Sequence, residues 1–287
     1  MSVVPAELES ARLRAGSAAH TRLLAQFFLD THVEYVPEEI SWPALRDEER
    51  ARLTGLPFWQ EAVATENITS NTVAAAAALE SDPEVRRAIA LQGLEEQRHA
   101  RLLAALTAHY GIAIEFPAPF TPRSLEDDFL FAGFGECFDS FFAFGLFALA
   151  SESGYFPSAL VHIFEPVMEE EARHILFFVN WVRARRARLP WWRRPAFRMR
   201  CAWIILKQVA SRVKTARTLG RESPASSENF TLTAHQELAA TVTLHGLLGR
   251  CLAENARRMA HYDARLFRPR LVPGIARLIH RLIPAGI

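Results

Sequence analysis

Apolar positions recur every three to four residues along most of the chain, which is typical of amphipathic α-helices. This pattern and its breaks at Gly and Pro predict helices over residues 7–31, 43–55, 57–80, 83–110, 124–152, 158–189, 195–218, 233–262 and 274–283. The two-residue alternation of half-buried strands is nearly absent. We therefore expect an all-α fold.

Two short turns join the longest helices in pairs. At the first turn Asp82 is the expected N-cap and Pro83 the first helical residue, and Gly111 ends the helix that follows. At the second turn Gly154 and Pro157 interrupt the chain. Helices joined by turns this short fold back on each other, so we expect two antiparallel pairs.

The segment 129–150 is long and apolar enough to imitate a membrane span. It carries Glu136 and Asp139 near its middle, and ionisable residues at bilayer depth are costly. We interpret it as the buried centre of a large helical bundle. The composition agrees, because 50% of the residues are hydrophobic and only 13 of 287 are glycine.

One acidic-basic phrase occurs twice inside the predicted helices. It reads LEEQRHA at 94–100 and EEEARHI at 169–175, so Glu96 stands three residues before His99 and Glu171 three before His174. Residues three apart are neighbours on one helix face. A carboxylate and an imidazole so placed converge on one point, where water, a salt bridge or a metal could lie.

Turn symmetry selects a partner carboxylate for each phrase. In an antiparallel pair, two residues equidistant from the turn lie at the same height. Glu66 and Glu96 are equidistant from residue 81, in the first turn, whereas Glu61 would put that point inside the helix.

The same argument applies to the second pair. Glu136 and Glu171 are centred on the turn at 153–154, whereas Glu152 and Glu171 are not. Glu136 is therefore the better partner, and a carboxylate in the most apolar helix then has a reason to be there.

Six candidate ligands result: Glu66, Glu96, His99, Glu136, Glu171 and His174. One Glu from each of two helices and E-x-x-H from each of two others is the ligand pattern of ferritin-like dimetal carboxylate proteins. Residues 57–188 resemble that superfamily, and the wording EEQRH and EEEARH is most similar to its oxygen-activating branch, which includes soluble acyl-carrier-protein desaturases and related oxygenases.

The resemblance implies a ferritin-like four-helix bundle with additional N- and C-terminal helices. It also implies two iron ions, with manganese as an alternative, O2 as cosubstrate and an external electron donor. The four carboxylates, Glu66, Glu96, Glu136 and Glu171, would take part in catalysis as metal ligands. The expected activity is oxidase or oxygenase chemistry of hydroxylase, N-oxygenase or desaturase type.

Charged residues beside the ligands could orient the histidines or balance the charge of the cluster: Asp139, Glu95, Glu170, Arg98 and Arg173. For Glu95, Glu169 and Glu170 taken individually, a solvated helix surface is the preferred interpretation. Thr69 and Ser70 follow Glu66 by about one turn, and their small side chains leave room above the metals.

Many phenylalanines could line a hydrophobic tunnel: Phe129, Phe131, Phe134, Phe141, Phe142, Phe144, Phe147, Phe177 and Phe178. Core packing accounts for most of them, and a bias toward an apolar or carrier-linked small-molecule substrate remains. Two alternatives stay open. One is a rubrerythrin-like peroxidase or ferroxidase, although Cys137, Cys201 and Cys251 make no rubredoxin-like module. The other is a non-enzymatic membrane-surface or adaptor protein.

Residues 183–221 contain no acidic residue and include Trp191, Trp192 and Trp203. Such a stretch can lie on an anionic membrane surface or dock an acidic carrier protein, and nucleic acid is not favoured. A solvated basic helix with inward-facing tryptophans weighs as much as these together.

We expect a bundle with N-terminal helices over 1–190 and a C-terminal helical extension over 191–287 that packs on it. A homodimer is compatible with this organisation. The N-terminus lacks a hydrophobic signal core, so we expect a cytoplasmic protein, or one peripheral to the inner membrane surface.

Overall fold

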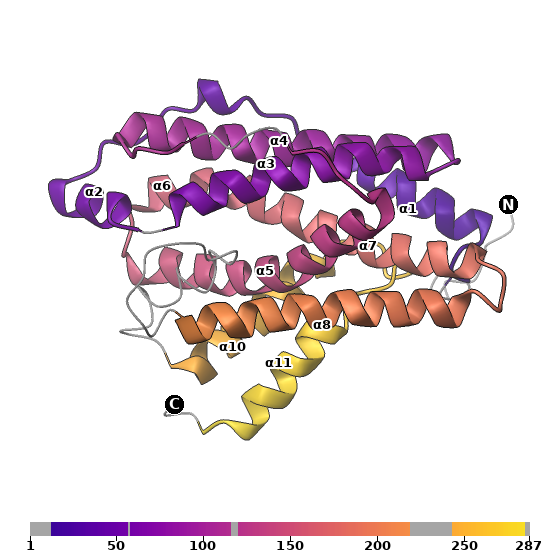
Figure 1. Cartoon of the computed structure of the whole chain (residues 1–287). Helices are drawn as coiled ribbons and strands as arrows, with labels where there is room; N and C mark the ends of the chain where they lie inside the picture. The colour runs from indigo at the N-terminus through magenta and orange to yellow at the C-terminus, as the bar shows by residue number, and fades with distance from the viewer. Residues whose placement is uncertain (1–12, 57, 116–119, 219–242, 285–287) are drawn as a thin grey trace, which may run out of the picture.

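A computed structural model describes residues 13–56, 58–115, 120–218 and 243–284. The described chain is helical and contains no strand (Figure 1). Its α-helices are α1 (Ala18–Asp30), α2 (Asp47–Thr54), α3 (Trp59–Ala76), α4 (Pro83–Tyr110), α5 (Leu125–Ser153), α6 (Ser158–Ile163), α7 (Glu165–Arg188), α8 (Arg194–Thr218), α10 (Leu244–Ala260) and α11 (Leu271–Leu282). Short 3-10 turns occupy Pro37–Glu39 and Ala77–Leu79.

The turn between α3 and α4 forms as the sequence predicts. The Asp82 carboxylate accepts hydrogen bonds from the backbone N–H groups of Glu84 (3.0 Å) and Val85 (3.2 Å), which caps α4. Gly111 ends α4 in the left-handed conformation, with φ 73°. The two helices approach closely at Gly93, where a Cβ would lie 2.9 Å from the backbone N of Ala74.

Several helix boundaries differ from the sequence prediction. The first helix begins at Ala18, because Gly16 has φ 76° and Ser17 caps the helix; residues 7–12 of that prediction lie outside the described residues. The predicted helix 158–189 is divided at Phe164 into α6 and α7. Pro166 has no N–H to donate to the carbonyl of His162, so a regular helix cannot continue through this point.

The C-terminal predictions are met in part by the described residues. The helix predicted over 233–262 is present as α10 from Leu244, and its first ten residues lie outside the described residues, as do Pro57 and 219–221. The last helix, α11, begins three residues earlier than predicted. These C-terminal differences lie outside α4 and α7, which carry the doubled phrase.

The most apolar helix, α5, packs against α3, α7, α8 and α10. It is long and apolar enough to cross a membrane by length and composition alone, and 56% of its most apolar window is buried inside the protein. The main core joins it to α1, α4 and α7 through Phe129 and Phe144 of α5, Phe28 of α1, Ile89 of α4 and Phe177 of α7. Glu136 therefore faces a protein interior, which is where the candidate site lies.

Candidate metal centre

Four helices bring acidic and histidine side chains together at the centre of the bundle. Glu66 of α3 lies with Glu96 and His99 of α4, and the same Glu96 lies with Glu136 of α5 and His174 of α7. In each group one possible ligand atom per residue lies within 4.8 Å of the others. Glu96 belongs to both groups, so its carboxylate stands between two candidate metal positions.

Distances at Nδ1 of each histidine define these two positions. Nδ1 of His99 lies 3.8 Å from Glu66 Oε2, 3.7 Å from Glu96 Oε2 and 3.4 Å from Glu171 Oε1. Nδ1 of His174 lies 2.9 Å from Glu96 Oε1. All six residues selected from the sequence therefore meet at one place. Glu152, the rejected candidate, is half exposed and pairs with Arg250 at 2.7 Å.

The other ring nitrogen of each histidine, Nε2, bonds a glutamate from the other copy of the doubled phrase. Nε2 of His99 donates to Glu170 Oε2 and Nε2 of His174 donates to Glu95 Oε2, both at 2.8 Å. A carboxylate can only accept, so Nε2 carries a hydrogen, and when the ring is neutral its lone pair is on Nδ1. This is the arrangement in which a carboxylate orients a metal-binding histidine.

The two arginines of the phrases complete the crossed pairing. Arg98 of α4 donates to Glu170 of α7, and Arg173 of α7 donates to Glu95 of α4 at 2.6 Å. The solvated surface expected for Glu95 and Glu170 is therefore wrong, because both are about 2% exposed or less.

Two other charged neighbours also differ from expectation. Glu169 is not simply solvated, since Arg258 donates to it at 2.6 Å. Asp139 does not reach a histidine and instead pairs with Arg212 of α8, whose Nε donates at 3.1 Å. The arginines of the phrases balance Glu95 and Glu170, not the ligand carboxylates.

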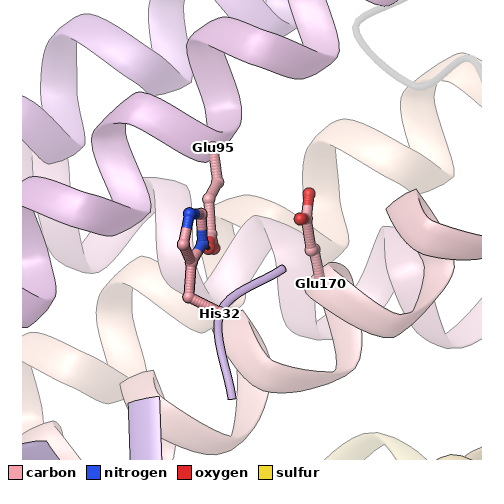
Figure 2. A group of neighbouring side chains, drawn as sticks. All are labelled: His32, Glu95 and Glu170. Atoms are coloured by element: carbon pink, nitrogen blue, oxygen red, sulfur yellow. Dashed lines mark hydrogen bonds and ion pairs between the residues drawn. The ribbon is translucent and has the colours of Figure 1, made fainter. Parts of the chain in front are cut away.

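A third histidine, which no sequence pattern selects, also contacts these supporting carboxylates. Nδ1 of His32, just after α1, lies 2.5 Å from Glu95 Oε1. Figure 2 shows the His32 ring against Glu95, with Glu170 projecting from α7 on the other side. These three residues also form a compact group, but Arg98, Arg173 and the site histidines already bond their carboxylates, so they form a supporting layer.

Two more supporting residues were missed although their spacing contained a signal. Ser140, one turn after Glu136, donates to Glu171 Oε2 at 2.6 Å. Gln92, one turn before Glu96, donates to Glu136 Oε2 at 3.4 Å. Both share a helix face with a ligand, so the four-residue spacing could have identified them.

Burial and mutual charge shift the ionisation of this cluster strongly. Burial, and then the charge of Glu96, raise the pKa of Glu66 and of Glu136 well above 4.5. Burial opposes ionisation of Glu96 too, but His174 and His99 lower its pKa far below 4.5. Burial likewise opposes ionisation of Glu95, and His174 and Arg173 outweigh it and hold the pKa at about 2.

The pKa values of the two site histidines are raised although burial lowers them. Burial alone would lower the pKa of His99 and His174, but hydrogen bonds and charges from the surrounding glutamates raise both well above 6.5. Without metal, these rings hold protons that compensate the ionised carboxylates. A divalent cation could replace those protons.

Four of the buried atoms without hydrogen-bond partners fit a metal site. They are Nδ1 of His99 and of His174 and Oε1 of Glu96 and of Glu136. Buried polar atoms are rarely left unpaired in proteins, because each one costs free energy. All four belong to the two candidate groups, so cations at those positions would supply the missing partners.

A cavity of about 390 Å³ borders all four ligand carboxylates. Apolar and small residues form most of its walls: Ile68, Phe131, Ala132, Ala143, Val167 and Met168. Its other side is polar, with Asp139, Gln208, Ser211 and Arg212. Thr69 lines it as well, whereas the Ser70 hydroxyl donates to the carbonyl of Asn67 at 3.0 Å.

The expected phenylalanine tunnel is largely core packing. Only Phe131 of those residues lines this cavity, whereas five are at most 1% exposed in the core: Phe129, Phe141, Phe144, Phe177 and Phe178. Rings of this size fill space between helices, and the small residues of α5 leave the cavity open.

Comparison with protein-family models, with curated proteins and with solved structures finds no match to the chain.

Proposed function

We propose that the protein is a ferritin-like dimetal carboxylate oxidoreductase that uses O2 to oxidise an apolar or carrier-linked small molecule. Its α3–α4 and α5–α7 pairs would be the four-helix bundle of that superfamily. The ligands would be Glu66, Glu96, His99, Glu136, Glu171 and His174, with Glu96 shared between the two ions. Iron is the expected metal and manganese the alternative.

The observation that carries this proposal is the pair of oriented histidines. Each has Nε2 fixed by a buried carboxylate and Nδ1 directed, without a hydrogen-bond partner, toward carboxylate oxygens. Ion pairs of the protonated rings, such as the 2.9 Å contact of His174 Nδ1 with Glu96 Oε1, account for part of this arrangement. They leave both Nδ1 atoms and Oε1 of Glu96 and of Glu136 without a hydrogen bond, and two cations would supply those partners.

The charge and chemistry of the ligands favour two divalent cations. Four ionised carboxylates and two neutral imidazoles balance the charge of two such ions, and Glu95 and Glu170 are balanced separately by Arg173 and Arg98. Mixed carboxylate and imidazole ligands suit iron or manganese and are not a thiolate site for zinc.

A bound pair of iron ions would supply electrons to O2, and an external donor would then reduce the ions again. The chain would hold the ions through the six ligands and fix the imidazoles through Glu95 and Glu170. The apolar walls of the cavity would exclude water and place an apolar group beside the carboxylates. The polar side of the cavity, at Gln208 and Arg212, would hold a polar end of the substrate.

The cavity favours an organic substrate over the peroxidase or ferroxidase alternative. A protein that consumes only peroxide or Fe(II) needs a small access path, whereas about 390 Å³ is within the size range of ligand pockets. If purified protein turned over peroxide without oxidising a cosubstrate, the alternative would be preferred.

The test is the metal content of protein purified without added metal, followed by thermal melting with Fe(II) under anaerobic conditions. We expect about two metal ions per chain, as in other two-metal sites. Fe(II) should raise the melting temperature of metal-free protein by on the order of 5–10 °C, because it binds only the folded state.

Glu136→Leu and Glu152→Leu provide a matched pair on the same helix. Without metal, ionisation of the buried Glu136 is opposed by burial and by the charge of Glu96, so Glu136→Leu should leave the metal-free melting temperature unchanged or higher and abolish the gain from Fe(II). Glu152→Leu should keep the full gain, since Glu152 lies at the surface. Equal gains in both variants would remove Glu136 from the site and contradict the four-helix assignment.

A further inference from the structure

Helix α8 has an apolar stripe that faces away from the protein. Phe197, Cys201 and Ile204 bury its inner face against the core. On the opposite face Met199, Trp203, Leu206 and Val213 follow each other at helical spacing and are exposed, with Met199 74% exposed. The sequence interpretation that these tryptophans pack inward is wrong for the described residues: Trp191, Trp192 and Trp203 all lie at the surface.

Helix α11 repeats this pattern. Val272 and Ala276 pack inward against α10 and α5, whereas Leu271, Ile275, Leu278 and Leu282 form an exposed stripe at spacings of four, three and four residues. In Figure 1 both helices lie on the side of the bundle away from α3 and α4. We call the exposed residues of α8 and α11, with Trp191 and Trp192, the outer face. Exposed apolar stripes of this kind, flanked by polar residues, mark interaction sites.

The charges of the outer face are all positive. Residues 183–221 and 264–287 contain no Asp or Glu. Arg198 on α8 and Arg277 and Arg281 on α11 flank the apolar stripes, are exposed, and form no ion pair with any described residue. Lys207 lies 5.6 Å from the centre of the Trp203 ring. The outer face therefore offers unpaired positive charge beside apolar and aromatic groups.

We propose that the outer face docks on the surface of an anionic lipid membrane, with the apolar stripes of α8 and α11 in the interfacial region and the basic residues against lipid phosphates. Helices with an aliphatic and Trp face flanked by Lys and Arg lie in this way at membrane surfaces. The proposal stands on these two helices and holds whether or not the site binds metal.

Charge argues against a second copy of this chain as the occupant. A symmetric dimer through the outer face would set its unpaired arginines against the same arginines of the other copy, and like charges repel. An anionic membrane instead meets every part of a basic and apolar face with a matching group.

Docking would also place the cavity close to lipid. The inner face of α8 provides Gln208, Ser211 and Arg212 to the cavity wall. The outer face is on the opposite side of the same helix, so about one helix diameter, roughly 10 Å, separates the cavity from the lipid surface. An apolar substrate dissolved in the membrane would have a short path to the site.

Flotation of the full chain with vesicles tests the proposal. We expect binding to vesicles of phosphatidylglycerol mixed with phosphatidylcholine, at least about tenfold weaker binding to phosphatidylcholine alone, and loss of binding between about 0.1 M and about 1 M salt. The three exposed tryptophans give a second signal: their emission should shift to the blue and be quenched by brominated acyl chains.

Matched variants locate the contact. Leu206→Ser with Leu278→Ser should weaken vesicle binding at least about tenfold, whereas Leu94→Ser on α4, equally exposed, should not. Arg198→Glu with Arg277→Glu should do the same, whereas Arg22→Glu with Arg87→Glu makes an equal charge change elsewhere and should have a small effect. Circular dichroism should show that all variants are folded.

Three results would overturn the proposal. The first is no binding of the chain to anionic vesicles, and the second is flotation of the outer-face variants equal to that of the parent. Light scattering could instead show a dimer that Leu206→Ser with Leu278→Ser converts to a monomer, in which case a second copy covers the outer face.

Discussion

The α4 and α7 copies of the doubled phrase contain the same residues in the same order, Glu-Glu-x-Arg-His, but their surroundings differ. Each copy gives its Arg and His to the first Glu of the other copy, so the crossed pairs are symmetric. The next layer is not. Glu95 has a third partner in His32, and Glu170 has no third partner among the described residues. Glu171 accepts a hydrogen bond from the Ser140 hydroxyl.

The helices that face the two copies differ as well. Glu66 comes from α3, which is rich in small polar residues, and its side chain is 16% exposed. Glu136 comes from the phenylalanine-rich α5, between the cavity and the core. If the proposed function is correct, the six candidate ligands are those that two metal ions require, whereas the supporting contacts follow from what each side of the bundle can offer.

The largest expected effect is on folding. Glu95→Ala would leave Arg173 and His174 buried without their carboxylate, and breaking a buried pair costs about 3–5 kcal/mol. Glu170→Ala should cost less, because Glu170 has two partners where Glu95 has three. Chemical denaturation of the metal-free variants measures this order. Equal and small losses would show that the crossed pairs do not support the fold.

The next effect is on metal content. Glu96 belongs to both groups of possible ligands and Glu66 to one. Glu96→Ala should therefore reduce bound metal toward zero, whereas Glu66→Ala should retain about one ion per chain. Elemental analysis after gel filtration gives the numbers, and Glu61→Ala on the same helix is the control. Identical losses for Glu96 and Glu66 would contradict a shared Glu96.

The pH dependence of stability should distinguish the two metal states. The pKa values of His99 and His174 are raised in the folded protein. Their contribution to the free energy of unfolding is therefore full below pH 6.5 and is lost as the pH rises through these raised pKa values. Glu66 and Glu136, raised above 4.5, act in the same direction. Metal-free protein should therefore melt at lower temperature as the pH rises above about 6.5.

Metal-loaded protein should show the opposite trend, because the ligands bind metal in their deprotonated forms. Melting curves from pH 6 to 9, with chelator and with Fe(II) under anaerobic conditions, give both slopes on the same preparation. Parallel slopes in the two states would mean that Fe(II) does not replace the protons of the cluster.

The smallest expected effect compares two serines at the same place in their helices. Ser140 follows Glu136 by four residues and bonds Glu171, whereas Ser70 follows Glu66 by four residues and bonds the carbonyl of Asn67. Ser140→Ala should weaken Fe(II) binding by about tenfold, and Ser70→Ala should leave it unchanged. Anaerobic titration measures both. A larger effect of Ser70→Ala would show that the serine on α3, and not Ser140 on α5, supports the metal ligands.

The sequence alone was enough to find the helices, the two turns and the six residues that meet in the bundle. These follow from local rules: the period of apolar positions, N-caps, Gly and Pro, and the equal heights of residues on either side of a short turn. Even the unexpected break at Phe164 has a local cause in Pro166. The four-residue spacing from Glu136 and from Glu96 would also have been enough to select Ser140 and Gln92.

Only the tertiary structure decided which residues support the ligands. The pairs Glu95–His174, Glu170–His99 and Glu95–His32 join segments that are not neighbours along the chain, and no period or turn relates their positions. Glu95 and Glu170 look like solvated residues because, within one helix, nothing distinguishes them from any charged residue. Burial by a distant helix makes them indispensable acceptors, since a buried arginine and a buried histidine must find a carboxylate wherever packing brings one.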